Sequence, residues 1–183
     1  MQTYIAILRG INVSGKNTIK MDKLNELFVR LNFQNVKTYI QSGNMVFQSK
    51  STDYQAFEKQ IQDKIREEFG FEVPVMVIQK SDWDFMATNN PFVNKRQEDI
   101  TKLHVTFFSK MPEQALFEKI KDGNYAADEF IISDKSIYLF CPNGYGNTKL
   151  SNNFFENKLK ITATTRNWKT VNELMTMAES IGL

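Results

Sequence analysis

The order in which apolar patterns change period constrains this 183-residue chain more than any other feature. Short apolar runs typical of strands alternate with stretches in which apolar residues recur every three or four positions, as on the buried face of a helix. In the first 80 residues the order is strand, helix, strand, strand, helix, strand. The segments that predict these elements are, in chain order, 3–8, 24–31, 36–41, 45–48, 54–69 and 73–79.

The same order recurs after a polar connector at 81–101, and a further helix ends the chain. The repeat rests on element order alone, since the two halves show no evident residue identity. We therefore expect an α+β protein of two ferredoxin-like βαββαβ halves with antiparallel sheets, plus a C-terminal helix. The expected divisions are 1–80, 81–101 and 102–183. The second set of elements is predicted at 103–108, 112–121, 129–133, 136–141, 149–159 and 162–166, with the last helix from Thr170.

Local signals refine the expected element boundaries. Ser81 and Thr170 each precede an acidic residue by three positions, a pattern typical of a helix capping box. Pro112 is expected in the first turn of its helix, where a missing N–H costs little. Gly43 supplies the positive φ that a tight hairpin between 36–41 and 45–48 needs, and Asp134-Lys135 is expected at the turn of the second hairpin.

Composition narrows the functional classes. Hydrophobic residues make up 42% of the chain, which is enough for a sizeable core, and no run approaches the roughly 18 apolar residues of a membrane span. The N-terminus lacks the basic and cleavage regions of a signal peptide. A single cysteine excludes an intrachain disulfide, so we expect a cytoplasmic protein. With one histidine and one cysteine, we expect no zinc site, and no cofactor motif is evident.

The first candidate binding segment follows the first predicted strand. Residues 10–17 nearly spell a phosphate-binding P-loop, but Asn17 stands where that loop needs a hydroxyl residue, and helical periodicity begins only near Leu24. A P-loop is therefore not expected. Two glycines with Arg9 and Lys16 leave a general anion site as one interpretation, and a structured surface loop as the other.

Two further segments lie in the second half. Arg166 ends a predicted strand and can offer its planar guanidinium to a carboxylate or phosphate, while Trp168 can stack on a ring or belong to the core. Residues 143–149 combine two glycines with an aromatic residue and suit either a ligand loop or an ordinary connector. Both interpretations stay open for each segment.

Catalytic residues are not identified, and whether the protein is an enzyme stays undecided. His104 and Cys141 lie within or at the end of predicted strands, so we expect both to be structural. The third predicted strand keeps Gly43 but lacks the aromatic that follows it in RNA-recognition sheets, which disfavours base stacking there.

Several segments nonetheless carry specific motifs. The chain reads Ile7-Leu8-Arg9-Gly10-Ile11-Asn12-Val13 with Gly15-Lys16-Asn17, then Tyr39-Ile40-Gln41-Ser42-Gly43-Asn44, Lys149-Leu150-Ser151-Asn152 and Thr164-Thr165-Arg166-Asn167-Trp168. In these motifs the chain resembles the bacterial family catalogued as domain of unknown function 1697. The resemblance implies a duplicated ferredoxin-like fold in a bacterial protein, and it implies no activity.

The polar segments suggest one ligand hypothesis. We expect a small anionic ligand, in particular a phosphorylated one, in a basic cleft between the two halves. The expected ligand-binding residues are Arg9, Asn12, Lys16, Gln41, Asn44, Lys149, Arg166, Asn167 and Trp168.

Two alternatives stay open beside this hypothesis. One is nucleic-acid or ribonucleoprotein binding through the N-terminal third, which has six basic and two acidic residues between positions 9 and 39. It is not favoured, because the net charge is only +2 and the pI about 8.5. The other is a ligand-free interaction module. No membrane partner is expected, and the oligomeric state is not predicted.

Overall fold

The computed structural model describes residues 1–133 and 135–182, and the chain divides into two compact units. The first unit comprises Met1–Phe85 together with the chain from Glu173 onward, and the second comprises Met86–Asn172. The divisions expected from the sequence, at 1–80, 81–101 and 102–183, stay a prediction. Asp134, expected at a hairpin turn, lies outside the described residues.

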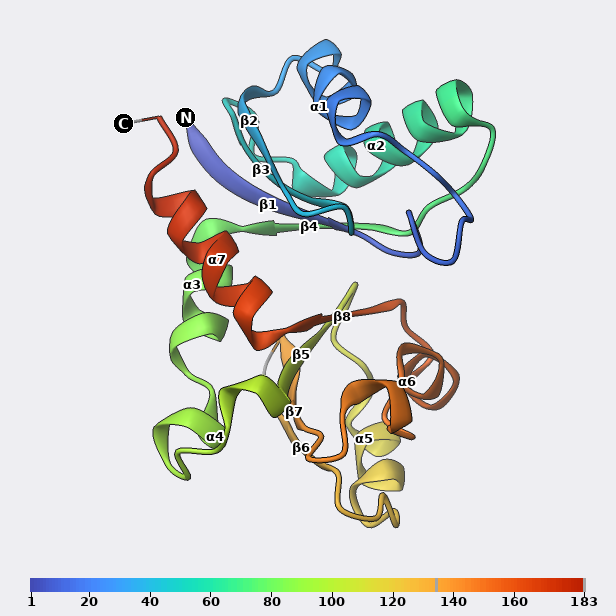
Figure 1. Cartoon of the computed structure of the whole chain (residues 1–183), viewed down its shortest axis with the longest axis vertical. Coiled ribbons are helices and arrows are strands. Elements are labelled where there is room, and N and C mark those ends of the chain that lie inside the picture. The colour runs from blue at the N-terminus through green and yellow to red at the C-terminus, as the bar shows by residue number, and fades with distance from the viewer. Residues whose placement is uncertain (134, 183) are drawn as a thin grey trace. The chain divides into compact units, whose positions relative to one another are not determined.

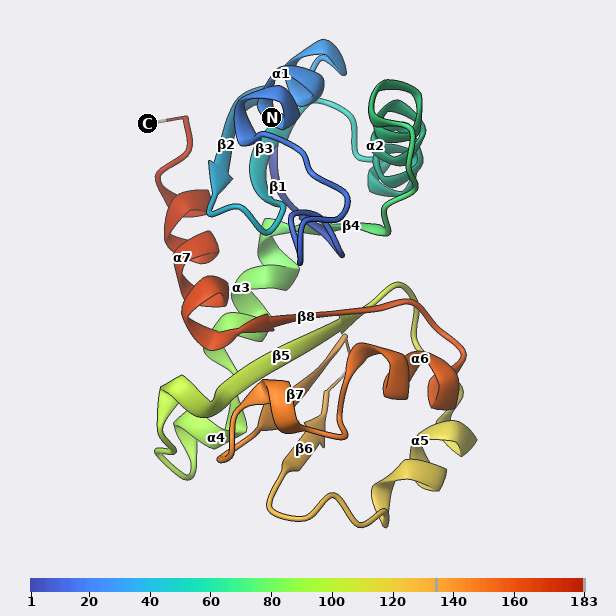
Figure 2. The same ribbon diagram turned by 45° about the vertical axis from the view of Figure 1, so that its right-hand side comes forward.

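The first unit contains a four-stranded antiparallel sheet in the order β2-β3-β1-β4 (Figure 1). Its helices α1 and α2 lie on the same face of the sheet in both ribbon views (Figure 2). The elements are β1 (Gln2–Leu8), α1 (Met21–Arg30), β2 (Gln34–Tyr39), β3 (Asn44–Ser49), α2 (Tyr54–Phe69) and β4 (Val75–Gln79), and α3 (Lys80–Thr88) begins here.

The helix-covered face of this sheet holds an aromatic core. In α1, Leu24, Leu27 and Phe28 recur at helical spacing and are fully buried, as the periodicity predicts. The Phe47 ring of β3 lies 4.3 Å from the Phe33 ring, centroid to centroid. Burial of each such side chain contributes about 1.5–3 kcal/mol, and close aromatic pairs add about 0.5–1.5 kcal/mol. At the start of α2, Asp53 accepts the Ala56 N–H and caps the helix.

The second unit contains another four-stranded antiparallel sheet, in the order β6-β7-β5-β8. Figure 2 shows α5 and α6 on one face of this sheet. The elements are α4 (Pro91–Asn94), a 3-10 turn (Ile100–Lys102), β5 (Leu103–Phe108), α5 (Gln114–Lys121), β6 (Glu129–Ile132), β7 (Ser136–Phe140), a second 3-10 turn (Tyr145–Asn147), α6 (Asn152–Leu159), β8 (Ala163–Asn167) and α7 (Trp168–Glu179), which continues into the first unit.

The predicted α+β class with two antiparallel sheets is confirmed. Counted within its own half, each sheet has the strand order second, third, first, fourth, because β6, β7, β5 and β8 correspond to β2, β3, β1 and β4. Each half also places its first helix between strands one and two, and its second between strands three and four.

Three predicted helix starts in the connector and second half are wrong by a few residues. Helix α3 begins at Lys80 rather than after Ser81, and the Asp84 carboxylate pairs with the Lys80 ammonium one turn earlier. Helix α5 begins at Gln114, so Pro112 lies before the helix and Glu113 stays extended. Helix α6 begins at Asn152 rather than 149, because Ser151 accepts the Phe154 N–H and caps it.

The last helix also begins earlier than predicted. Helix α7 starts at Trp168, and the side-chain oxygen of Asn167 accepts the backbone N–H of Thr170 at 2.8 Å. Thr170 was the predicted cap, but it lies inside the first turn and is buried. The capping function belongs to Asn167 because that residue ends β8 directly before the helix.

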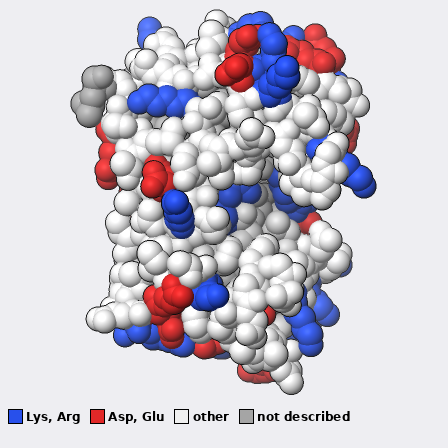
Figure 3. Space-filling model, in the orientation of Figure 1, with Lys and Arg blue, Asp and Glu red and all other residues white. Residues whose placement is uncertain are grey.

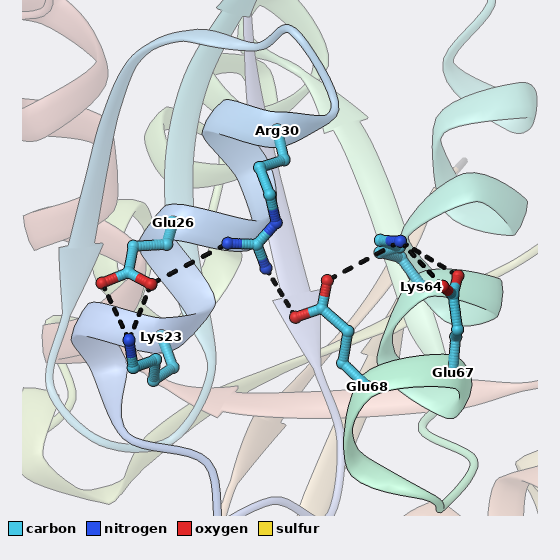
Figure 4. Close-up of polar contacts among 6 residues, drawn as sticks. All are labelled: Lys23, Glu26, Arg30, Lys64, Glu67 and Glu68. Atoms are coloured by element: carbon cyan, nitrogen blue, oxygen red, sulfur yellow. Dashed lines mark hydrogen bonds and ion pairs between the residues drawn. The ribbon is translucent and has the colours of Figure 1, made fainter.

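Acidic and basic side chains gather together over α1 and α2 on the face drawn in Figure 3. Figure 4 shows that six of them form a ladder of ion pairs, in which Arg30 of α1 contacts Glu68 of α2 at 2.5 Å. The basic residues of α1 are therefore partly neutralised within the unit. The members are Lys23, Glu26, Arg30, Lys64, Glu67 and Glu68. No helix among the described residues is long and apolar enough to cross a membrane.

Candidate functional site

The loop after β1 in the first unit has an unusual backbone. Positive φ angles occur at Gly10, Asn12, Ser14, Gly15 and Asn17. Short polar residues and glycine tolerate this left-handed conformation best, which explains the composition of the segment. The loop therefore has a defined conformation specified by its sequence, and it is not followed by a helix until Met21. That gap after Lys16 agrees with the expectation that no P-loop forms.

Asn12 holds this loop in place. Its side-chain amide donates to the Ile19 carbonyl at 2.9 Å and to the Gln41 carbonyl at 2.8 Å. Its side-chain oxygen accepts the Ile19 N–H at 2.9 Å. The side chain that the sequence suggested as a ligand donor thus makes three hydrogen bonds to the backbone, and it joins the loop after β1 to the turn between β2 and β3.

The β2–β3 turn packs tightly against the end of β1. Gly43 has φ 74°, and a Cβ atom there would lie 2.7 Å from Leu8 Cβ and 2.8 Å from Ile11 Cδ1. Asn44 is fully buried and donates to the Tyr39 carbonyl at 3.2 Å and to Ser42 Oγ at 2.8 Å. Ile40, a β-branched residue, has φ 47° although it is exposed. Such strain at a turn is a common property of functional loops.

The charged and polar residues of the first-unit loops differ in exposure. Lys16 and Gln41 are exposed, whereas Arg9 is half-buried and donates its backbone N–H to the Pro74 carbonyl at 3.0 Å. The structure thus brings the segments of Arg9, Asn12, Gln41 and Asn44 to one end of the first sheet. Lys16 lies at the exposed tip of the same loop.

In the second unit, one segment chosen from the sequence contacts His104 of β5, and the other lies on the neighbouring strand β8. The ring of Tyr145, from segment 143–149, stacks on the His104 ring with a centroid separation of 4.8 Å. Tyr145 also has an electrostatic effect that raises the pKa of Arg166, from segment 164–170. The Arg166 side chain donates to the Thr165 carbonyl at 3.1 Å. Arg166 pairs with Val105 in the register of β5 and β8, so its side chain leaves the sheet on the face opposite His104. We call these three residues, from two neighbouring strands and the 143–149 loop, the His104–Tyr145–Arg166 cluster.

The pKa values in this cluster are shifted by burial. Burial lowers the pKa of Arg166 to about 10, because the charged guanidinium loses contact with water, and the nearby Tyr145 opposes that shift. Burial also lowers the pKa of His104, and a hydrogen bond to the Lys102 backbone opposes it. His104 is therefore less charged near neutral pH than an exposed histidine, and Arg166 remains a half-buried cation on the neighbouring strand. An anion placed there would relieve the desolvation of the guanidinium.

The remaining predicted ligand residues of the second unit lie in different environments. Asn167 and Lys149 are exposed, and Asn167 Oδ1 caps α7. Trp168 is only 6% exposed, which fits the core interpretation better than ring stacking on a ligand.

Nearby, Cys141 is fully buried in the helix-covered core, and burial raises the pKa of its thiol to about 11. Among the described residues, no group of three His, Cys, Asp or Glu side chains is arranged to hold a metal ion.

His104 is the residue that sequence reasoning assigned to a purely structural function. The alternation of β5 places His104 on the same face as Thr106, and Thr106 Oγ1 lies 2.8 Å from Thr165 Oγ1. Thr165 in turn donates to Asn152 at the start of α6. A polar strip therefore crosses this part of the sheet. The alternating polar residues of 103–108 were the available signal, but the Tyr145 contact comes from a loop 41 positions away.

Comparison with known proteins places the fold and the family. A solved structure described as "conserved bacterial protein SP0830 from Streptococcus pneumoniae" is similar, with a TM-score of 0.75 and 21% sequence identity. The match covers 97% of this chain and 98% of that one, so the two share a fold. A search of curated proteins finds no match. The model of one family, described as "Protein of unknown function (DUF1697)", matches residues 1–138, and the chain belongs to this family.

Proposed function

We propose that this protein binds a small anionic ligand, with a phosphorylated metabolite as the favoured class, at the His104–Tyr145–Arg166 cluster of the second unit. The observation that carries the proposal is the half-buried guanidinium of Arg166 on β8, next to the strand on which segment 143–149 stacks through Tyr145. Arginine offers a planar, bidentate donor to phosphate, and the stacked His104 and Tyr145 rings lie on the neighbouring strand and loop.

A second basic group supports the same ligand class. In the first unit, the loop after β1, which Asn12 holds in place, has Lys16 at its exposed tip and Arg9 at its base. We include Gln41, Asn167 and Lys149 as polar residues at the edges of the two groups. The single cleft expected from the sequence, shared by both groups, stays a prediction.

The expected affinity is modest. Charge-assisted hydrogen bonds contribute about 1.5–3 kcal/mol each. Two or three of them, less the cost of ordering the ligand, correspond to binding in the micromolar to millimolar range. Such an affinity suits a metabolite whose concentration is of the same order.

Two further inferences, about the origin of the fold and the cellular setting, belong to this proposal. We infer that the two halves arose as a duplicated ferredoxin-like unit, which is supported by their common strand order. We also infer a cytoplasmic setting, which is supported by the single cysteine and its burial in the core.

A thermal-shift screen tests the proposal. The purified protein is heated with inorganic phosphate, sugar phosphates, nucleotides, carboxylates and short oligonucleotides, at low and high salt. A ligand at a hundred times its Kd stabilises a protein by about 2.7 kcal/mol, or several degrees. We expect a shift from a small phosphorylated compound that persists at high salt.

The matched variants are Arg166→Lys and Lys169→Ala. Arg166→Lys keeps a positive charge but loses the planar fork, so the shift should disappear in this variant. Lys169→Ala removes an exposed cation three positions away and should leave the shift unchanged. A signal that comes only from oligonucleotides and vanishes at high salt would contradict the proposal in favour of nucleic-acid binding.

A further inference from the structure

The helices hydrogen-bond to some edge strands of the two sheets through their side chains, but not to all of them. In the first unit, Asn25 of α1 donates to the Val36 carbonyl of β2 at 3.1 Å, and Glu58 of α2 accepts the Val77 N–H of β4 at 2.8 Å. In the second unit, Glu156 of α6 accepts the Ala163 N–H of β8 at 3.0 Å. Three edge strands therefore receive a side-chain hydrogen bond that occupies an outward backbone group, which blocks strand addition.

Strand β6 is the fourth edge, and its outward groups can be identified from the register. The Ser133 N–H donates to the Ser136 carbonyl at 2.9 Å, so this is a hydrogen-bonded pair. Because such pairs alternate along an antiparallel ladder, Ile131 also bonds to β7, while Phe130 and Ile132 direct their N–H and C=O groups away from it. Within the described chain, no helix side chain bonds to these outward groups.

A groove opens beside this edge. It has a volume of about 480 Å³ and lies between β6 and α5, within the size range of ligand pockets. Its apolar lining includes Met111, Phe117, Phe130 and Ile132, and Met111 is 56% exposed. In the first unit, the corresponding helix α1 instead reaches its edge strand through Asn25.

The charges around the groove are balanced. Lys121 Nζ lies 3.9 Å from Glu118 Oε2 at the rim, and Arg96 pairs with Glu129 at the start of β6 at 2.6 Å. Because these two pairs already hold opposite charges together, the groove complements an uncharged apolar side chain better than a charged one.

From these observations we infer that β6 and its groove form a docking site for a short extended peptide of a partner protein, which adds as a strand and inserts an uncharged apolar side chain. The outward groups of Phe130 and Ile132 are two positions apart, the repeat that an extended backbone matches. Strand β6 spans Glu129–Ile132 and is therefore about 13 Å long. An edge this short cannot supply the roughly 1,200–2,000 Å² of a stable dimer, so a peptide fits better than a second copy.

The test is fluorescence polarisation with a dye-labelled peptide in which Leu alternates with Thr, with Lys at both ends. We expect saturable binding to the full chain. Replacing each Leu by Lys should weaken binding at least tenfold, because a charged side chain does not fit the apolar groove. Replacing each Thr by Pro should also weaken binding at least tenfold, because proline has no backbone N–H to pair with β6. Amide exchange at Phe130 and Ile132, followed by NMR, should slow at least tenfold in the bound state.

Two protein variants complete the experiment. Met111→Asp places a charge in the groove and should weaken binding at least tenfold, whereas Val29→Asp changes a similarly exposed residue of the first unit and should not. Failure of the Leu peptide to bind, equal binding of its Pro version, or amide changes away from β6 would overturn the inference. So would a dimer in sedimentation equilibrium that Met111→Asp dissociates, since the occupant would then be a second copy.

Discussion

The carboxylate of Glu58 accepts a hydrogen bond from the backbone N–H of Val77 at 2.8 Å, which joins α2 to the outer edge of β4. The second unit repeats this arrangement, with Glu156 of α6 accepting the Ala163 N–H of β8 at 3.0 Å. Each glutamate stands four residues after the first residue of its helix. A side chain in the same position of each half thus protects the edge of the fourth strand.

Glu58 provides a prediction about pH. Burial raises the pKa of Glu58 above its ordinary value of 4.5, and the Val77 hydrogen bond only partly opposes that. The folded state therefore binds the proton more tightly than the unfolded state, and this group's contribution to stability is lost as pH rises above about 4.5. Glu58→Gln keeps an oxygen acceptor without the charge. We expect it to be at least as stable as the wild type at pH 7 and to lose part of this pH dependence.

Urea unfolding at pH 4.5 and pH 7 measures the effect, with Glu58→Ala as the control. The alanine variant leaves the Val77 N–H without its acceptor and should lose about 1 kcal/mol of unfolding free energy. If Gln and Ala destabilise the protein equally at pH 7, the assignment of the cost to the buried charge is contradicted.

Gly43 provides a second prediction. An alanine Cβ would meet Leu8 Cβ at 2.7 Å, and the residue has φ 74°, so both packing and backbone oppose the side chain. We expect Gly43→Ala to cost about 2–4 kcal/mol of unfolding free energy. Gly10→Ala is the matched control, since Gly10 has a similar φ of 77° but open space around its Cα, and should cost about 1–2 kcal/mol. Equal costs in denaturant unfolding would show that contact with Leu8 is unimportant.

A variant of Asn12 distinguishes a structural function of this side chain from a ligand-binding one. Asn12→Asp keeps the acceptor for the Ile19 N–H but loses both donors, to the Ile19 and Gln41 carbonyls. It also places a carboxylate beside two carbonyl oxygens. We therefore expect a loss of about 2–3 kcal/mol, measured by chemical denaturation. A variant that unfolds like the wild type but no longer binds phosphate would instead show that Asn12 acts on a ligand.

Cys141 should be chemically inert in the folded protein. The thiol is fully buried, and burial raises its pKa to about 11, so the reactive thiolate is scarce at pH 8. We expect iodoacetamide to modify it at least a hundredfold more slowly in the native protein than in guanidinium chloride, as followed by mass spectrometry. Native alkylation within tenfold of the unfolded rate would contradict the assigned burial.

Much of the fold could be predicted from sequence because apolar residues recur in each helix and strand at the spacing typical of that element. Leu24, Leu27 and Phe28 recur at helical spacing, and β5 matches its predicted bounds of 103–108. The helix caps were harder to predict. Thr170 carries a local capping pattern, but Asn167 holds the position directly before the helix, and only the end of β8 determines that.

The candidate site could be predicted only in part. The polar segments were visible as composition, but their contacts depend on long-range packing. Asn12 reaches Gln41 across 29 positions, and Tyr145 stacks on a histidine of another element. A residue's capacity to donate hydrogen bonds is evident from its type, whereas the partner that uses that capacity is not. Asn12 and Asn44 therefore appeared as ligand donors although their side chains bond to neighbouring segments.

The most direct test of the proposed function is an NMR titration of the isotope-labelled protein with inorganic phosphate and with a nucleoside monophosphate. We predict saturable chemical-shift changes at Tyr145, His104 and residues 164–167, absent in Arg166→Lys and preserved in Lys169→Ala. Shifts that never saturate, or that occur only away from the His104–Tyr145–Arg166 cluster, would contradict the assignment of anion binding to this site.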